Sequence, residues 1–133
     1  MGADALVGSE GAGWEPLDEA LDFASAMLCA EAVGAMKFAC DTTLEYLKTR
    51  KQFGVTLGSF QALQHRMVDM CVATEQARSI TYLACARLDA AADPAERRRT
   101  VAAARIKIAD NARLVGQEAI QLHGGMGMTL EMK

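Results

Sequence analysis

A repeat of apolar residues at alternating steps of three and four constrains the fold of this chain more than any other feature. Its members are Phe60, Leu63, Met67, Met70, Thr74, Ala77, Thr81, Ala84 and Leu88. This spacing is typical of a helix that packs nearly antiparallel against neighbouring helices. We interpret the methionines in the repeat as adaptable core residues rather than as a ligand site. The repeat therefore predicts a long, packed helix in the middle of the chain.

A long helix is also expected before this repeat. Pro16 suits a first helical position, where the backbone N–H has no partner within the helix. Between Leu17 and about Arg50 the chain has no proline and a single glycine, Gly34. Because glycine in a helix costs about 1 kcal/mol relative to alanine, Gly34 indicates either close approach of a backbone or ligand, or crowding between helices. The apolar residues predicted to share the packed face are Leu17, Leu21, Ala24, Leu28, Ala35 and Phe38.

The third predicted helix has the clearest start signal. The segment from Asp93 to Glu96 forms a capping box with proline at the first helical position. Gly124 and Gly125 supply a residue that can take positive φ just past the C-terminal end of this helix. Ser59 is predicted to be the N-cap of the central helix. The apolar positions of the third helix are Val101, Ala104, Ile108, Ala112, Val115, Ala119 and Leu122. Three long helices with short connections predict an all-α, up-and-down antiparallel bundle.

Composition excludes several classes of partner. The 133 residues have the size of one domain, and 14 Lys and Arg against 17 Asp and Glu give a net charge of -3. The basic residues are scattered, so nucleic acid is not an expected partner. The cysteines lie within apolar helical patterns and lack the spacing of a metal site, which predicts core residues in a reducing compartment, the cytoplasm. No apolar stretch reaches the roughly 18 residues that a membrane helix requires, so no membrane association is expected.

Few side chains could carry chemistry. The two histidines, His65 and His123, have no spacing to a serine, cysteine or carboxylate that would predict a hydrolytic triad. Ala62 stands where a di-iron Glu-x-x-His motif would need glutamate, and no metal site is predicted. Two segments remain: residues 50–54 (the RKQFG motif) and residues 124–127 (the glycine motif, GGMG). Arginine can pair bidentately with a pyrophosphate and glycine permits close backbone approach, although either segment alone also fits an ordinary helix end.

Together these motifs resemble a known family. The RKQFG motif, the following segment 60–70 (FQALQHRMVDM) and the segment 121–129 (QLHGGMGMT) resemble, in order and spacing, the C-terminal helical domain of acyl-CoA dehydrogenases. The resemblance runs from about Ala3 to the last residue. The opening segment 6–14 (LVGSEGAGW) is similar to the family's link from its middle β-domain. We therefore expect residues 1–15 to be a linker from a missing β-domain and residues 16–133 to be the helical bundle with its fourth helix truncated.

The resemblance implies a flavoprotein. Members of the family remove the α proton and β hydride of an acyl-CoA, transfer the hydride to FAD and pass electrons to an electron-transferring flavoprotein. The matching positions imply contacts with FAD, shared with a neighbouring subunit, by Arg50, Gln52, Phe53, Gln61, Gln121, Gly124 and Gly125. The ordinary alternatives are a solvated helix-end cation for Arg50 and surface amides for the glutamines.

Departures from the family pattern concern substrate and catalysis. The family usually places Asp-x-x-Arg on the first helix near the acyl-CoA. Here Asp22 keeps the acidic position, as the candidate substrate contact, but Ser25 replaces the arginine. The family's catalytic glutamate matches no residue here: Ala24, at its position in a minority of members, cannot take a proton. Glu131 follows the glycine motif too closely, so we interpret it as an exposed carboxylate. No catalytic residue is therefore assigned, and the chain alone is expected to be inactive.

An apolar stripe left without the fourth helix predicts a homodimer or homotetramer. Two alternatives remain open from the sequence. One is a helical interaction module that binds no flavin. The other is a domain of a related flavin-dependent oxidase or monooxygenase, since the surroundings of the flavin ring decide reactivity toward oxygen.

Overall fold

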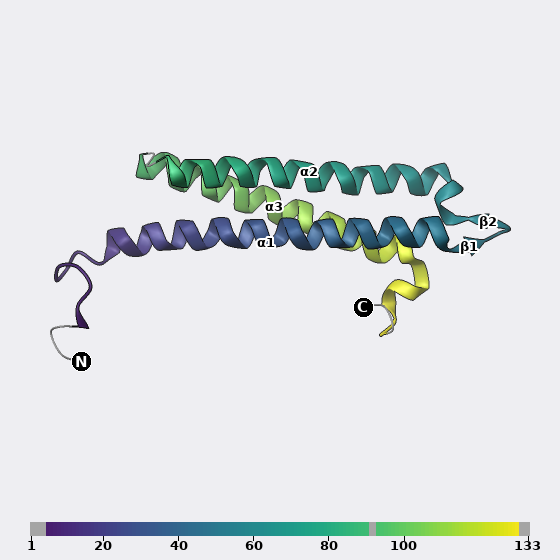
Figure 1. Ribbon diagram of the computed structural model, residues 1–133, viewed down its shortest axis with the longest axis horizontal. Coiled ribbons are helices and arrows are strands. Elements are labelled where there is room, and N and C mark those ends of the chain that lie inside the picture. The colour runs from purple at the N-terminus through teal and green to yellow at the C-terminus, as the bar shows by residue number, and fades with distance from the viewer. Residues whose placement is uncertain (1–4, 91–92, 131–133) are drawn as a thin grey trace.

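The computed structural model describes residues 5–90 and 93–130 and contains three long helices. These are α1 (Trp14–Thr49), α2 (Gln61–Asp89) and α3 (Pro94–His123). The strands β1 (Lys51–Gln52) and β2 (Val55–Thr56) and the 3-10 helix η2 (Leu57–Ser59) connect α1 to α2, and the 3-10 helix η3 (Gly124–Met128) follows α3. All three long helices pack against one another, and α1 and α3 end at the same end of the bundle as the hairpin (Figure 1). The predicted all-α, up-and-down architecture is confirmed.

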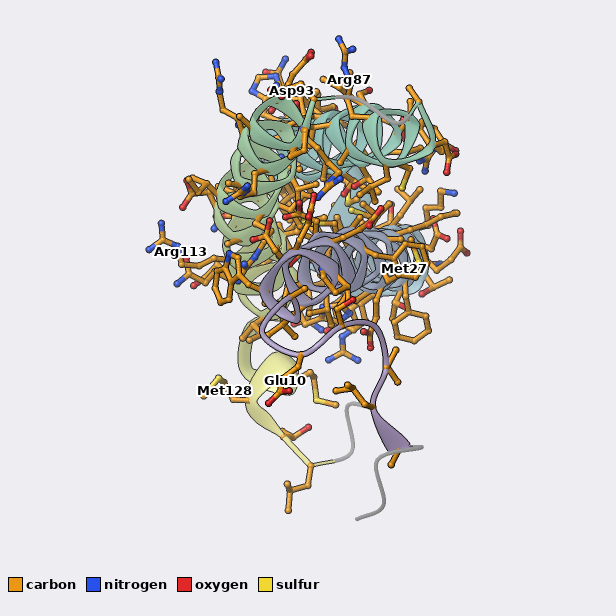
Figure 2. The ribbon with its side chains drawn as sticks, turned by 90° about the vertical axis from the view of Figure 1, so that its left-hand side faces the viewer. Glu10, Met27, Arg87, Asp93, Arg113 and Met128 are labelled. Atoms are coloured by element: carbon orange, nitrogen blue, oxygen red, sulfur yellow. The ribbon has the colours of Figure 1, made fainter. Side chains whose placement is uncertain are left out.

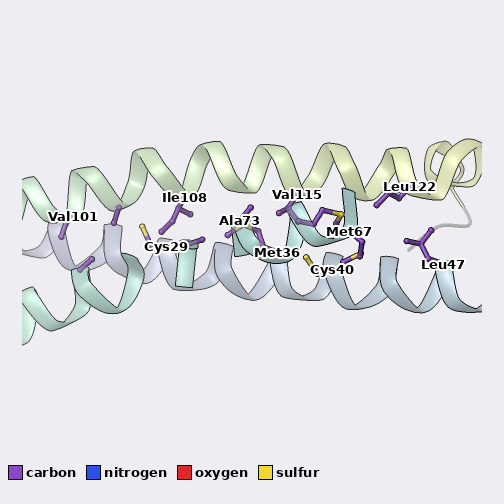
Figure 3. Packing of buried hydrophobic residues seen from close by; sticks show 14 residues of the cluster. Cys29, Met36, Cys40, Leu47, Met67, Ala73, Val101, Ile108, Val115 and Leu122 are labelled. Carbon is purple, nitrogen blue, oxygen red and sulfur yellow. The ribbon is translucent and has the colours of Figure 1, made fainter. Parts of the chain in front are cut away.

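The core lies along the shared axis of the three helices (Figure 3). The apolar repeats predicted for α2 and α3 supply most of it, because Met67, Met70, Val101 and Val115 are all buried. The buried Asn111 on α3 donates from Nδ2 to the backbone oxygen of Ala73 on α2 at 2.8 Å. Such a bond satisfies a buried amide and fixes the relative position of the two helices.

The packed face predicted for α1 is wrong. The leucines and the phenylalanine of that stripe, Leu17, Leu21, Leu28 and Phe38, are 51 to 66% exposed, and Ala24 and Ala35 are exposed as well. The face that packs inward instead carries Asp22, Ala26, Cys29, Met36, Cys40, Thr43 and Leu47. Most of these are small or polar. Close packing between three helices accommodates small side chains. The sequence prediction chose the face with the larger, more hydrophobic side chains and therefore chose the wrong one.

The helix ends agree only in part with the sequence predictions. Asp93 caps α3 as predicted, accepting at 3.2 Å from the backbone N–H of Glu96. However, α1 begins at Trp14, two residues before Pro16, because any of the first four N–H groups of a helix lacks a partner. Ser59 does not cap α2: it lies in η2 and its hydroxyl donates to the oxygen of Thr56.

Two other expectations concerned cysteines and glycine. Cys29 and Cys40 are buried as predicted, but Cys71 is exposed and Cys85 only half-buried, and all four are free thiols. A side chain at Gly34 would meet nothing within 4 Å, so neither close approach nor helix crowding occurs there among the described residues. The expected carboxylate Glu131, the start of the family resemblance at Ala3 and the first four residues of the expected linker lie outside the described residues.

One described helix, α1, has the length and apolar composition of a membrane-spanning segment. Its apolar 18-residue window contradicts the expectation from the sequence that no apolar stretch reaches that length. The core helix of a soluble protein can have the same composition, and 22% of this window is buried. Most of the apolar surface of α1 is therefore free to contact something outside this chain.

Candidate functional site

The RKQFG motif forms a tight hairpin at the end of α1. Arg50 leaves the helix in an extended conformation, and its N–H donates to the oxygen of Tyr46 at 2.8 Å. Its own carbonyl accepts from the N–H of Leu57 at 2.9 Å, which closes the loop. Lys51 pairs with Thr56 and Gln52 with Val55 in antiparallel register. Among the described residues the Arg50 guanidinium makes no ion pair, so it is free to meet an anion.

Phe53 occupies the turn of this hairpin in an unusual conformation. Its φ is 57° and that of Gly54 is 82°, so both turn residues are left-handed, as a two-residue hairpin turn requires. A bulky residue at positive φ is strained, and Phe53 is also 87% exposed. Its ring packs in a T-shaped arrangement with that of Phe60, with centroids 6.1 Å apart. The turn therefore holds an aromatic ring out in solvent at a cost in backbone strain, which makes Phe53 a candidate binding residue.

The glycine motif turns the chain back on the end of α3. Gly124 has φ of 60°, as predicted from its place after the helix, and its N–H donates to the oxygen of Gln121. That amide is therefore not available to a ligand, and Gly124 contributes through shape. A side chain at Gly125 would meet nothing within 4 Å. At Gly127, by contrast, it would collide with the carbonyl oxygen of Ile120, a constraint that sequence reasoning missed.

A contact between Tyr46 and His123 joins the two motifs. The rings stack at a tilt of 39° with centroids 4.4 Å apart, and the Tyr46 hydroxyl donates to the oxygen of His123 at 3.4 Å. Tyr46 lies one helical turn before Arg50, and His123 immediately precedes Gly124. The contact therefore fixes the relative position of the two motifs.

The structure gathers all seven predicted cofactor residues at one end of the bundle. Arg50, Gln52 and Phe53 lie in the hairpin, Gln61 begins α2, and the remaining three lie at the end of α3: Gln121, Gly124 and Gly125 (Figure 1). All seven are exposed. The Gln52 side chain donates to the oxygen of Lys51 at 2.8 Å, whereas Gln61 and Gln121 make no side-chain hydrogen bond within residues 5–90 and 93–130. A hollow of about 670 Å³ lies elsewhere, between Cys71 and Leu83 on α2 and Lys107 on α3.

Asp22, the candidate substrate contact, lies toward the opposite end of the bundle, where its partner Arg97 stands near the start of α3. It is buried, and its Oδ2 accepts from Nε of Arg97 at 3.0 Å. That hydrogen bond raises the pKa of the Arg97 guanidinium. The sequence lacks an arginine at Ser25, but α3 brings one to the same carboxylate. No group of three His, Cys, Asp or Glu side chains in the described part of the chain could hold a metal ion.

Comparison with known proteins gives consistent matches. Residues 11–133 match the family "Acyl-CoA dehydrogenase, C-terminal domain". The L-prolyl-[peptidyl-carrier protein] dehydrogenase of a Serratia species is 35% identical over 95% of this chain and 32% of its own length. The Acyl-CoA dehydrogenase IpdE2 of Mycobacterium tuberculosis is 39% identical over 83% of this chain and 32% of its own. The chain thus spans about a third of the curated relatives it matches.

Solved structures of proteins from this family have the same arrangement of helices. Butyryl-CoA dehydrogenase from Megasphaera elsdenii superposes with a TM-score of 0.93 at 30% identity, over 100% of this chain and 34% of that one. A structure described as PigA with FAD and proline gives a TM-score of 0.85 at 36% identity, over 94% of this chain and 32% of that one. The three-helix arrangement is therefore that of a domain found within larger flavoproteins.

Proposed function

Because the chain belongs to the acyl-CoA dehydrogenase family, whose C-terminal domain it matches over residues 11–133, we propose that it is the FAD-binding and oligomerisation domain of a flavin-dependent acyl-CoA dehydrogenase. One observation carries the proposal: the Tyr46–His123 contact holds the RKQFG motif and the glycine motif at the same end of the bundle. Two motifs that are far apart in sequence thereby form one exposed surface.

The residues of this surface suit the pyrophosphate and adenosine end of FAD. Arg50 supplies an unpaired guanidinium for a phosphate. Phe53 presents an exposed ring face, and Gln61 and Gln121 supply amides. Gly124 and Gly125 leave room for close approach, since a side chain at either would meet nothing in the described chain. When bound, FAD supplies the hydride acceptor of the dehydrogenation.

The surface is open rather than enclosed, which suits a site completed by a second subunit. In the full-length enzyme the partners would be an acyl-CoA, with Asp22 toward the substrate end, and an electron-transferring flavoprotein. The described chain offers no base to abstract the α proton, since Ala24 carries no proton acceptor. Its role in such an enzyme is to hold the cofactor and the assembly, and we expect it to work in the cytoplasm.

A second candidate substrate is a thioester on a carrier protein. The 35% identity to an L-prolyl-[peptidyl-carrier protein] dehydrogenase favours it, and so does Ser25 in place of the arginine that the family usually sets near the acyl-CoA. Both candidates use the same cofactor surface, so they share one test.

That test is a titration of the purified chain with FAD, followed by flavin fluorescence. We expect a dissociation constant below 1 mM that rises roughly tenfold in Arg50→Ala, the value of about one charge-assisted hydrogen bond. Arg113→Ala is the matched control, because Arg113 is an exposed arginine on the flank of α3 (Figure 2). No binding up to 1 mM FAD would favour a helical interaction module without flavin, and equal affinities of the two variants would show that Arg50 does not contact the cofactor.

A further inference from the structure

An ion pair joins α2 to α3 near the candidate cofactor surface. Arg66 Nε donates to Glu118 Oε2 at 2.6 Å, and the two side chains are 39% and 24% exposed. Short, charge-assisted hydrogen bonds of this kind are among the stronger ones in proteins, and this one raises the pKa of the Arg66 guanidinium. In the described part of the chain one other ion pair joins these two helices, Arg87 with Glu96, and it lies at the opposite end of the bundle.

The pair lies close to two glutamines of the cofactor surface, one on each helix. Glu118 is three residues before Gln121 on α3, a spacing that places both side chains on the same face of the helix. Arg66 is five residues after Gln61, the first residue of α2, which is a rise of about 7.5 Å along the helix axis. The spacing between the two glutamines therefore depends on how α2 and α3 are placed against each other at this end.

An ion pair supplies something here that apolar packing does not. Apolar contacts are already present at this end of the core, where Met67 and Leu122 are buried. A half-buried ion pair adds little net stability, because the cost of desolvating the charges offsets their attraction. Its hydrogen bond is directional, however, so a charged pair that bridges two helices favours one register over the others.

We propose that Arg66 and Glu118 are positioning residues of the cofactor surface, and that their ion pair sets the spacing between Gln61 and Gln121. The assignment rests on the proposed function, because the role it gives the pair is in FAD binding.

Two other contacts place the remaining parts of this surface. The stacked rings of Tyr46 and His123 hold α1 against α3. The Gln64 side chain donates from Nε2 to the oxygen of Gly58 at 2.7 Å, which ties the start of α2 to the connection from the hairpin. The ion pair completes the set, because it relates α2 to α3.

The first test needs no cofactor. In the 133-residue chain, ¹H–¹⁵N chemical shifts report on the backbone and side-chain amides of Gln61 and Gln121. Arg66→Ala should shift the Gln121 signals on the opposite helix, and Glu118→Ala should shift those of Gln61. Arg87→Ala is the matched control, since it breaks the other ion pair between α2 and α3 and should leave both glutamines unchanged. Unchanged glutamine signals in both test variants would overturn the proposal.

A titration with FAD measures the consequence for binding. Arg66→Ala and Glu118→Ala should each weaken FAD binding about 2- to 10-fold, whereas Arg87→Ala should leave it unchanged. Reversing the pair, in Arg66→Glu with Glu118→Arg, keeps the net charge and should restore most of the affinity. Tighter binding in Glu118→Ala would show that the freed Arg66 contacts the cofactor itself, which overturns the proposal.

A second background separates positioning from a general structural role. A positioning residue acts through the residue that it places, so Arg66→Ala should weaken FAD binding less in a chain that already carries Gln121→Ala than in the wild-type chain. An equal loss in the two backgrounds would overturn the proposal. If the wild-type chain binds no FAD, the proposed function fails, whereas the amide shifts still decide whether the ion pair places the two glutamines.

Discussion

Gly127 is the glycine of the C-terminal motif that the backbone itself requires. A side chain there would collide with the carbonyl oxygen of Ile120 and lie 3.2 Å from Cβ of His123, whereas at Gly125 it would meet nothing within 4 Å. Gly127→Ala should therefore lower the free energy of unfolding by about 1–3 kcal/mol. Gly125→Ala should change it by less than about 0.5 kcal/mol and weaken FAD binding instead. Urea unfolding of both variants measures the difference, and equal losses of stability would contradict this division of roles.

The buried thiols predict a loss of stability at alkaline pH. Burial raises the pKa of Cys29 and of Cys40, opposed by the charge of Arg105 at the first and by the hydrogen bond with Thr74 at the second. The folded chain therefore holds both thiols neutral to a higher pH than the unfolded chain, whose thiols ionise near a pH of about 8.5. Their contribution is complete below that pH and is lost as the pH rises through the folded pKa values.

Replacing both thiols, in Cys29→Ala with Cys40→Ala, should flatten the decline of unfolding free energy between about pH 8 and 10. Cys71→Ala is the comparison: Cys71 is exposed and only adds to the raised pKa of Cys40, so its removal should flatten the slope less than the double variant does. Denaturant titrations at a series of pH values measure the slope. If the free energy of unfolding still declines steeply with pH in the double variant, the decline comes from titratable groups other than these two thiols.

At the scale of elements, α2 and α3 were predictable and the inward face of α1 was not. On α2 and α3 a regular spacing of three and four selects the packed face, although large apolar residues such as Leu83 and Ile106 lie exposed outside it. On α1 large apolar residues occupy a second face as well, and the buried one relies on small side chains such as Ala26 and Cys29. The hairpin was missed because its turn, Phe53-Gly54, lacks the asparagine or aspartate that usually signals positive φ.

The candidate site was likewise predictable only in part. Arg50 and Gly124 stand in recognisable local motifs, so sequence could name them. Tyr46 and His123 are 77 positions apart, and each alone fits an ordinary aromatic position in a helix. Their contact emerges only when α1 and α3 run side by side. Sequence could therefore name the residues of the surface but not what fixes its geometry.

That contact yields a prediction about the two helix ends. Tyr46→Ala removes the ring stacked on His123 and should cost about 2–4 kcal/mol of stability, as for a large aromatic truncated at a half-buried site. It should also weaken FAD binding, because the two motifs lose their fixed spacing. Tyr46→Phe keeps the ring and loses only a 3.4 Å hydrogen bond, so it should retain most of both properties. If Tyr46→Phe is as damaging as Tyr46→Ala, the hydroxyl rather than the stack joins the ends.

At the scale of the whole molecule, the outer face of α1 is the largest unexplained feature. Leu21 is 53% exposed and Leu28 62%, with Phe23, Met27 and Phe38 also exposed along the same helix. Met27 points away from α3 in Figure 2. Burying even a few hundred Å² of apolar surface stabilises an association by several kcal/mol, at about 25 cal/mol per Å². Single exposed leucines are ordinary in proteins, but five large apolar side chains exposed along one helix favour a protein contact.

We expect that contact to be a second copy of the chain, giving the homodimer or homotetramer proposed for the family domain. Light scattering at micromolar concentration should then show a mass of at least twice 14.2 kDa. Leu21→Lys with Leu28→Lys should shift the mass to that of a monomer, because a charge buried at an interface without a partner is costly. Leu83→Lys is the matched control: Leu83 is 49% exposed but lies on α2, so the assembly should persist. A monomeric wild-type chain would instead assign the α1 face to a different protein segment.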